Sequence, residues 1–153
     1  MEILQASVAD LERILEVQKL AYESEARLYD DWNIQPLTQS LAELKIDFSE
    51  KVFFKAKVKG NLVGSVRAYE LDGHIGRLIV HPNWQGKGIG TALMRNVEKA
   101  FSHMQYFELF TGFRSENNIG FYQILGYGIY KSKGILHAKE KYNLKYNLIY
   151  ALR

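Results

Sequence analysis

The sequence predicts a mixed α/β fold, an α+β mixed sheet with helices, formed as one domain over residues 1–153. Two observations predict this class. Apolar residues repeat with a helical period in the first third of the chain and again beyond its middle, whereas apolar and polar residues alternate over residues 51–80. The dipeptides Gly60-Asn61 and Asp72-Gly73 interrupt the alternating stretch, which is typical of hairpins in an antiparallel meander. The expected order is β-α-α-β-β-β-α-β-α-β-β, with a mixed, largely antiparallel sheet.

The first third of the chain predicts a strand and two helices. A strand over Glu2–Ala6 is followed by Ser7, which can cap a helix together with Asp10 three residues later. An apolar stripe then runs towards Ala26, and the aperiodic residues 29–36 predict a loop. Thr38 can cap the second helix, whose apolar face is Leu37, Leu41, Leu44 and Phe48.

The remaining elements follow from the change of period and from the turn residues. Strands are expected over residues 51–58, Leu62–Leu71, His74–Val80, Tyr106–Thr111, Gly128–Ser132 and Tyr146–Leu152, and helices over Thr91–His103 and Asn118–Leu125. Gly126 is expected to end the last helix.

Composition excludes several classes of function. The chain has no cysteine, so it has neither disulfides nor thiolate metal sites nor a cysteine nucleophile, and we expect no bound metal. It has no apolar run near 18 residues and no signal-peptide pattern at Met1–Gln5, so we expect a cytoplasmic protein that does not contact a membrane. The formal charge of +3 suits an anionic ligand without specifying one.

The most informative segment is Gln85-Gly86-Lys87-Gly88-Ile89-Gly90, which follows a predicted strand and precedes a predicted helix. Glycines at 86, 88 and 90 can take positive φ, so that successive backbone N–H groups converge at the positive end of a helix dipole. This arrangement predicts a pyrophosphate site. A P-loop would need Ser or Thr after Lys87, and a Rossmann loop needs Gly-x-Gly-x-x-Gly, so both agree poorly with this spacing.

Gln85–Gly90 resembles the acetyl-CoA loop of the GNAT acyltransferases, Gln/Arg-x-x-Gly-x-Gly/Ala. The preceding Leu78-Ile79-Val80-His81-Pro82 is similar to the fourth strand of that family. Further on, Phe121-Tyr122-Gln123-Ile124-Leu125-Gly126-Tyr127 resembles its aromatic-Tyr-x-x-x-Gly-aromatic segment. The order of elements agrees from Glu2 to the C-terminus. The resemblance implies a GNAT-like fold, splayed between strands 4 and 5, and an acetyl-CoA-dependent N-acetyltransferase acting on a primary amine.

The resemblance also implies how acetyl-CoA, the co-substrate, would bind. Backbone N–H groups from Gly86 to Thr91 would hold the pyrophosphate, and the main chain of Leu78–Val80 would pair with the pantetheine arm. Many family members have an asparagine seven residues before the tyrosine, where this chain has Ser115. Asn118 is therefore our candidate for that contact, although capping of the short helix would explain it equally. The candidate acetyl-CoA residues are Leu78, Ile79, Val80, Gln85, Gly86, Lys87, Gly88, Ile89, Gly90, Thr91 and Asn118.

Three residues are candidates for proton transfer. Tyr122 matches the family tyrosine that protonates the departing thiolate, and its alternative role is that of an amphipathic core tyrosine. A lysine-like amine has a pKa near 10.4 and must lose a proton before it attacks. The family often has a glutamate where His74 stands; His74 could relay the proton, Glu70 across the same hairpin is the second candidate, and ordered water is the third option.

The acceptor is expected to be a small molecule rather than a protein. Tyr29, Asp30, Asp31 and Trp32 combine carboxylates with aromatic rings, which can receive a cationic amine, or else Trp32 packs the loop onto the sheet. The alternative function is a non-catalytic acyl-CoA-binding or sensing module on the same fold. A nucleic-acid-binding domain is disfavoured, since Lys131, Lys133, Lys139, Lys141 and Lys145 accompany no reader motif. A homodimer is compatible with the sequence.

Overall fold

A computed structural model describes residues 1–112, 114–131 and 146–151. One sheet has the strand order β1-β2-β3-β4-β5-β7-β6. The strands are β1 (Glu2–Gln5), β2 (Val52–Val58), β3 (Asn61–Tyr69), β4 (His74–Val80), β5 (Phe107–Gly112), β6 (Gly128–Lys131) and β7 (Tyr146–Ala151), and the helices are α1 (Leu11–Tyr29), α2 (Gln35–Thr38), α3 (Leu41–Glu50), α4 (Ile89–Ala100) and α5 (Glu116–Ile124). Short 3-10 turns, η1 (Val8–Asp10) and η2 (Pro82–Trp84), precede α1 and follow β4.

The sheet is mixed, as predicted. Strands β2 to β4 form the expected antiparallel meander and β1 pairs antiparallel with β2, whereas the β4–β5, β5–β7 and β6–β7 pairs are parallel. Parallel pairing is therefore more extensive than we expected. The reason lies in the connections, because parallel neighbours need a long crossover, and residues 132–145 separate β6 from β7.

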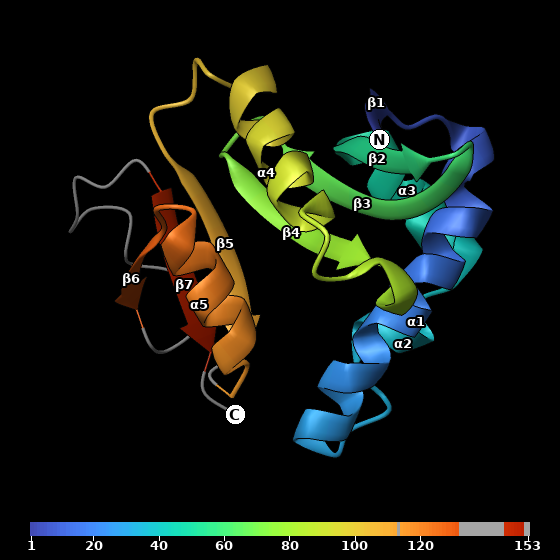
Figure 1. The fold of residues 1–153 in the computed structure, drawn as a ribbon, viewed down its shortest axis with the longest axis horizontal. Coiled ribbons are helices and arrows are strands. Elements are labelled where there is room, and N and C mark those ends of the chain that lie inside the picture. The colour runs from blue at the N-terminus through green and yellow to red at the C-terminus, as the bar shows by residue number, and fades with distance from the viewer. Residues whose placement is uncertain (113, 132–145, 152–153) are drawn as a thin grey trace.

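Strands β4 and β5 pair over only part of their length. The register joins His74 to Glu108 and Ile75 to Leu109, and no further pairs follow. Figure 1 shows the two strands close together at one end and diverging towards the end of β4. The splay expected between strands 4 and 5 is thus confirmed, and it leaves the second half of β4 unpaired on the β5 side.

The helices cover both faces of the sheet. Because strand side chains alternate, Phe54 packs in the core under α4, whereas its neighbour Phe53 packs in the core under α1 and α3. On the first face α4 buries Leu93, Met94 and Val97. Figure 1 shows α4 and α5 lying on the same face of the sheet, in front of the region where β4 and β5 diverge.

A β-bulge interrupts β4 at Arg77. Arg67 pairs with Gly76 and Ser65 with Ile79, so two residues of β4 lie opposite one of β3, and Arg77 has a φ of 48°. The bulge changes which side chains share a face. Leu78 packs in the core on the α4 side together with Ile75, and Ile79 packs on the α1 side. Regular alternation would have placed Ile75 and Ile79 on one face.

The caps of the N-terminal helices agree only in part with the prediction. The Ser7 amide donates to Asp10 at 2.7 Å, which confirms the capping box. Thr38 is wrong as the cap of the second helix, because it ends the short α2. Ser40 caps α3 instead and accepts from the Glu43 amide at 3.1 Å. Serine at the N-cap with glutamate three residues later is the stronger signal, and the prediction overlooked it.

Some predicted features lie outside the described residues. Of the C-terminal lysines only Lys131 is described, and Lys133, Lys139, Lys141 and Lys145 are not. Among the helices that the structure describes, none is both long and apolar enough to cross a bilayer.

Candidate functional site

The glycine-rich loop leads into the N-terminus of α4. Gly86 and Gly88 have φ values of 74° and 81°, and Gly88 is the N-cap of the helix. At both positions a Cβ would meet nothing within 4 Å, so the loop backbone faces open space. The backbone N–H groups of Ile89, Gly90 and Thr91 belong to the first helical turn, where no intrahelical acceptor is available. The loop therefore offers converging donors.

Gly90 has a different role from the other two glycines. It is a helical residue, and a Cβ there would lie 3.3 Å from the ring of Phe121 on α5. The prediction that all three glycines supply positive φ is thus wrong at Gly90, because there the missing side chain permits close packing between α4 and α5. Ile89 is likewise buried in the core, so only its main chain faces the loop.

Two side chains fix the loop to the end of β4. The Gln85 amide donates to the Val80 carbonyl at 3.0 Å, and the backbone N–H of Asn83 donates to His81 Nδ1 at 3.1 Å. Lys87 is exposed and lies with its ammonium 5.9 Å from the Trp84 ring. The Gln85 side chain thus ties the loop to the last residue of β4.

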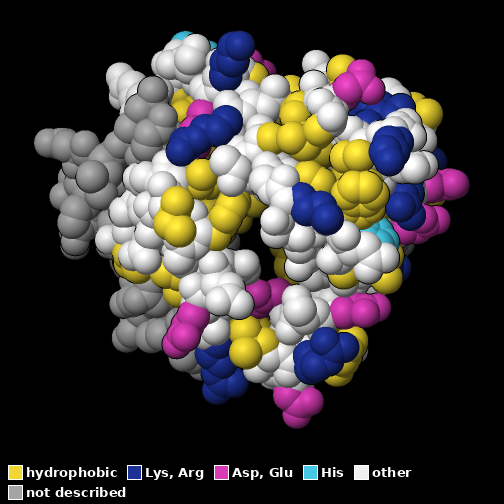
Figure 2. All heavy atoms as spheres, viewed as in Figure 1, with side chains coloured by type: hydrophobic (Ala, Val, Ile, Leu, Met, Phe, Trp, Pro, Cys, Tyr) yellow, Lys and Arg dark blue, Asp and Glu magenta, His cyan; other side chains and the backbone are white. Residues whose placement is uncertain are grey.

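Tyr122 belongs to α5 and packs against the core on the α4 side of the sheet. Its ring contacts Phe121 and Tyr127 at centroid distances of 5.1 and 6.0 Å, and it is half-buried. Burial raises the pKa of the Tyr122 phenol, and the nearby Tyr22 and Glu25 of α1 raise that pKa further. Tyr122 belongs to α5, whereas Tyr22 and Glu25 belong to α1. The phenol of Tyr122 therefore lies near both helices. Figure 2 shows the surface hollowed near its centre, where Figure 1 draws β4 and β5 diverging; we call this hollow the opening.

Glu25 connects the two sides of this opening. Its carboxylate accepts from Ser115 Oγ at 2.8 Å and from Asn118 Nδ2 at 3.1 Å. Asn118 is therefore not the helix cap, since Ser115 holds that position and Asn118 lies inside α5. The prediction missed Glu25. Tyr22, Glu25 and Tyr29 follow the helical spacing of three and four residues, and this pattern would have placed them on one face.

The two candidate bases lie in different surroundings. His74 begins β4, its ring lies 4.9 Å from that of Phe110, and it lines a pocket beside Gly76. Glu70 is exposed in the turn beyond the end of β3, and it does not line that pocket. Of the two candidate bases, only His74 lines this pocket.

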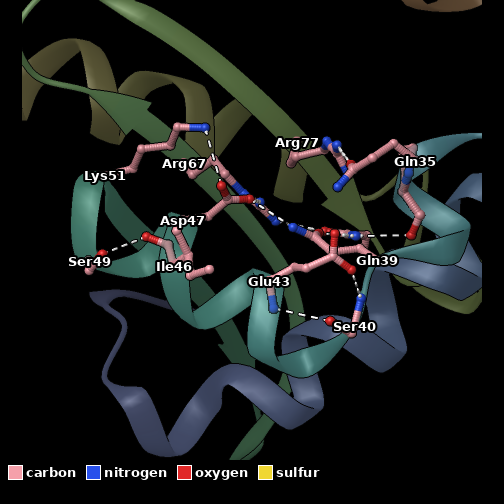
Figure 3. A network of polar contacts seen from close by, with 12 residues as sticks. Gln35, Gln39, Ser40, Glu43, Ile46, Asp47, Ser49, Lys51, Arg67 and Arg77 are labelled. Atoms are coloured by element: carbon pink, nitrogen blue, oxygen red, sulfur yellow. Dashed lines mark hydrogen bonds and ion pairs between the residues drawn. The ribbon is translucent and has the colours of Figure 1, made fainter.

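The pocket has a volume of about 210 Å³ and lies on the α3 side of β3 and β4. Its lining residues are Asp47, Lys51, Arg67, His74, Gly76 and Arg77. Figure 3 shows the polar network around it, in which Asp47 of α3 meets Arg67 of β3 and Arg77 reaches Gln35 of α2. Burial lowers the pKa of Arg67 to about 10, an effect that the nearby Arg77 adds to and that the Asp47 carboxylate opposes.

The predicted acceptor loop lies at the end of α1. The Tyr29 hydroxyl accepts from the Arg114 amide at 3.0 Å, and Asp31 accepts from the Asn33 amide at 2.9 Å. Asp30 is exposed and has a φ of 50°. Trp32 is 51% exposed, with the Arg27 guanidinium 5.9 Å from its ring, so it does not pack the loop onto the sheet. None of the four residues lines the pocket.

Metal ligands do not cluster in the described ranges. Within residues 1–112, 114–131 and 146–151, no group of three or more His, Asp or Glu side chains is arranged to hold an ion.

Solved structures share this fold. The PaiA N-acetyltransferase of Thermoplasma acidophilum, in complex with coenzyme A, has a TM-score of 0.72 and 20% identity, over 87% of this chain and 92% of that one. A phosphinothricin acetyltransferase of Sinorhizobium meliloti, in complex with AcCoA, has a TM-score of 0.64 and 21% identity, over 83% and 74%. At these identities the likeness shows the fold.

Sequence relatives and a family model agree with the structural likeness. Acetyltransferases of Yersinia pseudotuberculosis and Pectobacterium atrosepticum are each 36% identical to this chain over 90 residues, which is 56% of this chain and 63% of theirs. The matched part therefore spans less than two thirds of those relatives. The model of the acetyltransferase (GNAT) family matches residues 11–127, more than half of the chain. The chain belongs to the acetyltransferase (GNAT) family.

Proposed function

We propose that this protein transfers the acetyl group of acetyl-CoA to the primary amine of a small molecule. The observation that carries the proposal is the open edge of β4, which is followed, after the short η2 turn, by the glycine loop at the start of α4. The unpaired main chain of β4 can form hydrogen bonds as a strand edge does, and the N-terminus of α4 then offers backbone N–H donors. A thioester on a long arm that ends in a pyrophosphate needs these two features in this order.

The donor side would be held mainly by main-chain groups. The amides from Gly86 to Thr91 would bind the pyrophosphate, favoured by the positive end of the α4 dipole. Leu78–Val80 would pair with the pantetheine arm along the edge that β5 leaves free. The open space at Gly86 and Gly88 supports this placement, because phosphate oxygens can approach the backbone closely. The relatives solved with coenzyme A and AcCoA support it as well.

The reaction would proceed by direct attack. The neutral amine nitrogen bonds to the acetyl carbon, the carbon–sulfur bond breaks, the amine gives up a proton, and the departing thiolate receives one. Tyr122 is the proposed donor of the second proton. A tyrosine phenol is protonated at neutral pH, and the raised pKa of Tyr122 is consistent with that state, in which the phenol can donate to the sulfur. Its position near α1 and α5 favours contact with a group lying in the opening.

The proton of the amine would leave through His74 or through water. His74 lines the pocket beside the β4 bulge, which supports it over the exposed Glu70. Asp30, Asp31 and Trp32 remain the proposed rim, where a cationic amine would first be attracted. The Asp30 amide donates to carbonyls of the last turn of α1, and the Asp31 carboxylate accepts from the Asn33 amide, which holds these two residues at the end of α1.

The test is release of coenzyme A from acetyl-CoA in the presence of a panel of small primary amines. Turnover that requires both protein and amine, with the acetylated amine identified by mass spectrometry, would support the proposal. Acetyl-CoA binding without turnover on any amine would contradict it and would identify a non-catalytic acyl-CoA-binding module.

A further inference from the structure

The pocket under α3 has a positively charged lining. Lys51, Arg67 and Arg77 face one carboxylate, that of Asp47. Three cations and one anion leave an excess of positive charge on the wall. The pocket has a volume of about 210 Å³. A pocket of this size and charge suits a small ligand with an anionic group.

Arg67 and Asp47 satisfy each other and are held by two glutamines. Arg67 Nη1 donates to Asp47 Oδ2 at 3.0 Å, and Arg67 Nη2 donates to Gln18 Oε1 at 2.6 Å. Gln39 donates to the same Asp47 oxygen at 2.8 Å and accepts from Gln18 at 2.9 Å. The Arg67 side chain is 4% exposed, and its guanidinium lies over the Phe53 ring at 4.5 Å. This pair therefore builds the wall of the pocket.

Arg77 differs from Arg67 because one of its donors has no partner. Its Nη1 atom is buried and makes no hydrogen bond to the residues that the structure describes. Its Nη2 donates to Gln35 Oε1, and its guanidinium lies 5.8 Å from the Tyr22 ring. Gln35 and Tyr22 thus fix the group in place (Figure 3 shows the Gln35 contact). A buried N–H without an acceptor costs free energy that an incoming anion would recover.

Tyr22 relates Arg77 to the proposed acid. The Arg77 guanidinium lies over the Tyr22 ring, and Tyr22 in turn is close enough to Tyr122 to raise the pKa of its phenol. The β4 bulge also places Arg77 on the pocket side, three residues before Val80, which leads to the glycine loop. The unsatisfied guanidinium and the proposed catalytic phenol therefore flank the same residue of α1.

We infer that Arg77 binds the carboxylate of the acetyl acceptor, so that the substrate class is a small amino acid or a similar amine that carries a carboxylate. This inference rests on the proposed function. A guanidinium presents its N–H groups in a planar fork that matches two carboxylate oxygens. A phosphate can also accept from an arginine fork, so the first experiment includes it as the competing anionic group. The anionic group would enter the pocket while the amine points towards the opening.

The first experiment compares matched acceptors with the unmodified protein. Amino acids, their carboxamides and amines with a phosphate in place of the carboxylate are assayed for coenzyme A release. The inference expects kcat/KM to be at least roughly tenfold higher for each carboxylate than for its carboxamide, as loss of a charged hydrogen bond implies. Equal values for the two, or preference for the phosphate, would overturn it and leave the proposed acetyl transfer standing.

The second experiment removes the guanidinium. Arg77→Met should reduce the carboxylate-to-carboxamide ratio of kcat/KM by roughly ten- to a hundredfold, and Arg77→Lys should restore part of it. The control is Lys45→Met, which makes the same charge change at an exposed position of α3 outside the pocket. Its ratio should equal that of the parent. A ratio that Arg77→Met leaves unchanged would overturn the assignment of Arg77.

Calorimetry separates failure of this inference from failure of the proposed function. Glycine or alanine is titrated into the protein saturated with coenzyme A, and then into the Arg77→Met variant. If no amine is acetylated, the acetyl-transfer proposal fails, whereas binding that Arg77→Met abolishes would still support the carboxylate site. Absence of binding by the parent protein together with absence of turnover would overturn both.

Discussion

Ser115 Oγ lies 2.8 and 2.9 Å from the two carboxylate oxygens of Glu25, although the two residues belong to opposite sides of the splayed sheet. The contact joins the second half of α1 to the start of α5. It also holds a carboxylate near the Tyr122 phenol, whose pKa it helps to raise. The Glu25 side chain thus links α1 to α5 and also raises the pKa of the proposed acid, Tyr122.

Glu25→Gln should lower the pKa of Tyr122 towards the ordinary tyrosine value. The substitution removes a negative charge that disfavours the phenolate, while burial of the phenol continues to raise the pKa. Ultraviolet difference titration, with Tyr122→Phe used to assign the signal, measures the change. Glu23→Gln, at an exposed position of the same helix, is the control. An unaltered Tyr122 titration in Glu25→Gln would show that the carboxylate does not act on the phenol.

Acetyl-CoA should raise the Tm of the parent protein, and it should raise the Tm of Gly88→Ala much less. The parent shift is expected because the ligand binds the folded state through the loop backbone, and the smaller shift is expected because the variant weakens that binding. Gly60→Ala is a matched control, because Gly60 has the same φ of 81° and equally open surroundings in a distant turn. Each variant should lose about 1–2 kcal/mol from backbone strain. Equal ligand shifts in the two variants would count against the loop.

Tyr122→Phe should reduce kcat by about a hundred- to ten-thousandfold while the acetyl-CoA affinity changes little. The phenol would act on the leaving sulfur, whereas the ring packing against Phe121 and Tyr127 is kept by phenylalanine. Steady-state kinetics and a thermal shift with acetyl-CoA measure the two quantities. Parental turnover in the variant would assign Tyr122 to packing alone.

His74→Gln should flatten the acidic limb of kcat/KM for the acceptor if His74 receives the amine proton. Glu70→Gln should leave the profile unchanged, because Glu70 is exposed in the turn outside the pocket. Profiles with two amines of different basicity separate a limb of the enzyme from one of the substrate. Parental profiles in both variants would favour proton transfer through water.

Asp10→Asn should destabilise the fold at neutral pH by about 1 kcal/mol, through loss of the capping box. Burial raises the pKa of Asp10, but the hydrogen bonds from Lys55 and Ser7 outweigh it, so the pKa lies below its ordinary value. The contribution is therefore present above about pH 4 and is lost as the pH falls through the lowered pKa. Urea unfolding of both proteins across this range checks it, with exposed Glu2→Gln as the control. A pH-independent difference would contradict the linkage.

The sequence predicted the element order apart from the short α2, because the longer helices and the strands each carry a local signal. The period of two over residues 51–80 and the turns at Gly60 and Gly73 gave three strands whose pairing is observed. The splay came from the family resemblance and not from periodicity. Parallel pairing of β6 with β7 is a long-range property that alternation within either strand does not encode.

The site was predictable where it depends on backbone and unpredictable where it depends on distant side chains. Gly86 and Gly88 have the positive φ that the spacing suggested, since only local sterics decide it. Glu25 meets Ser115 across 90 positions of sequence, and no local pattern marks that pair. Asn118 illustrates the same limit, because its side chain reaches Glu25 instead of capping its own helix.

The bulge at Arg77 has a consequence for comparing this chain with its relatives. The extra residue shifts the alternation of side chains along β4. Odd-numbered residues before it and even-numbered residues after it therefore face the same side of the sheet. An alignment that places a gap one residue away would exchange Arg77 for Leu78, a guanidinium on the pocket wall for an apolar contact of α4. If Arg77 binds the acceptor as proposed, deleting this one residue would remove the guanidinium from the pocket wall and change acceptor preference, while the glycine loop stayed intact.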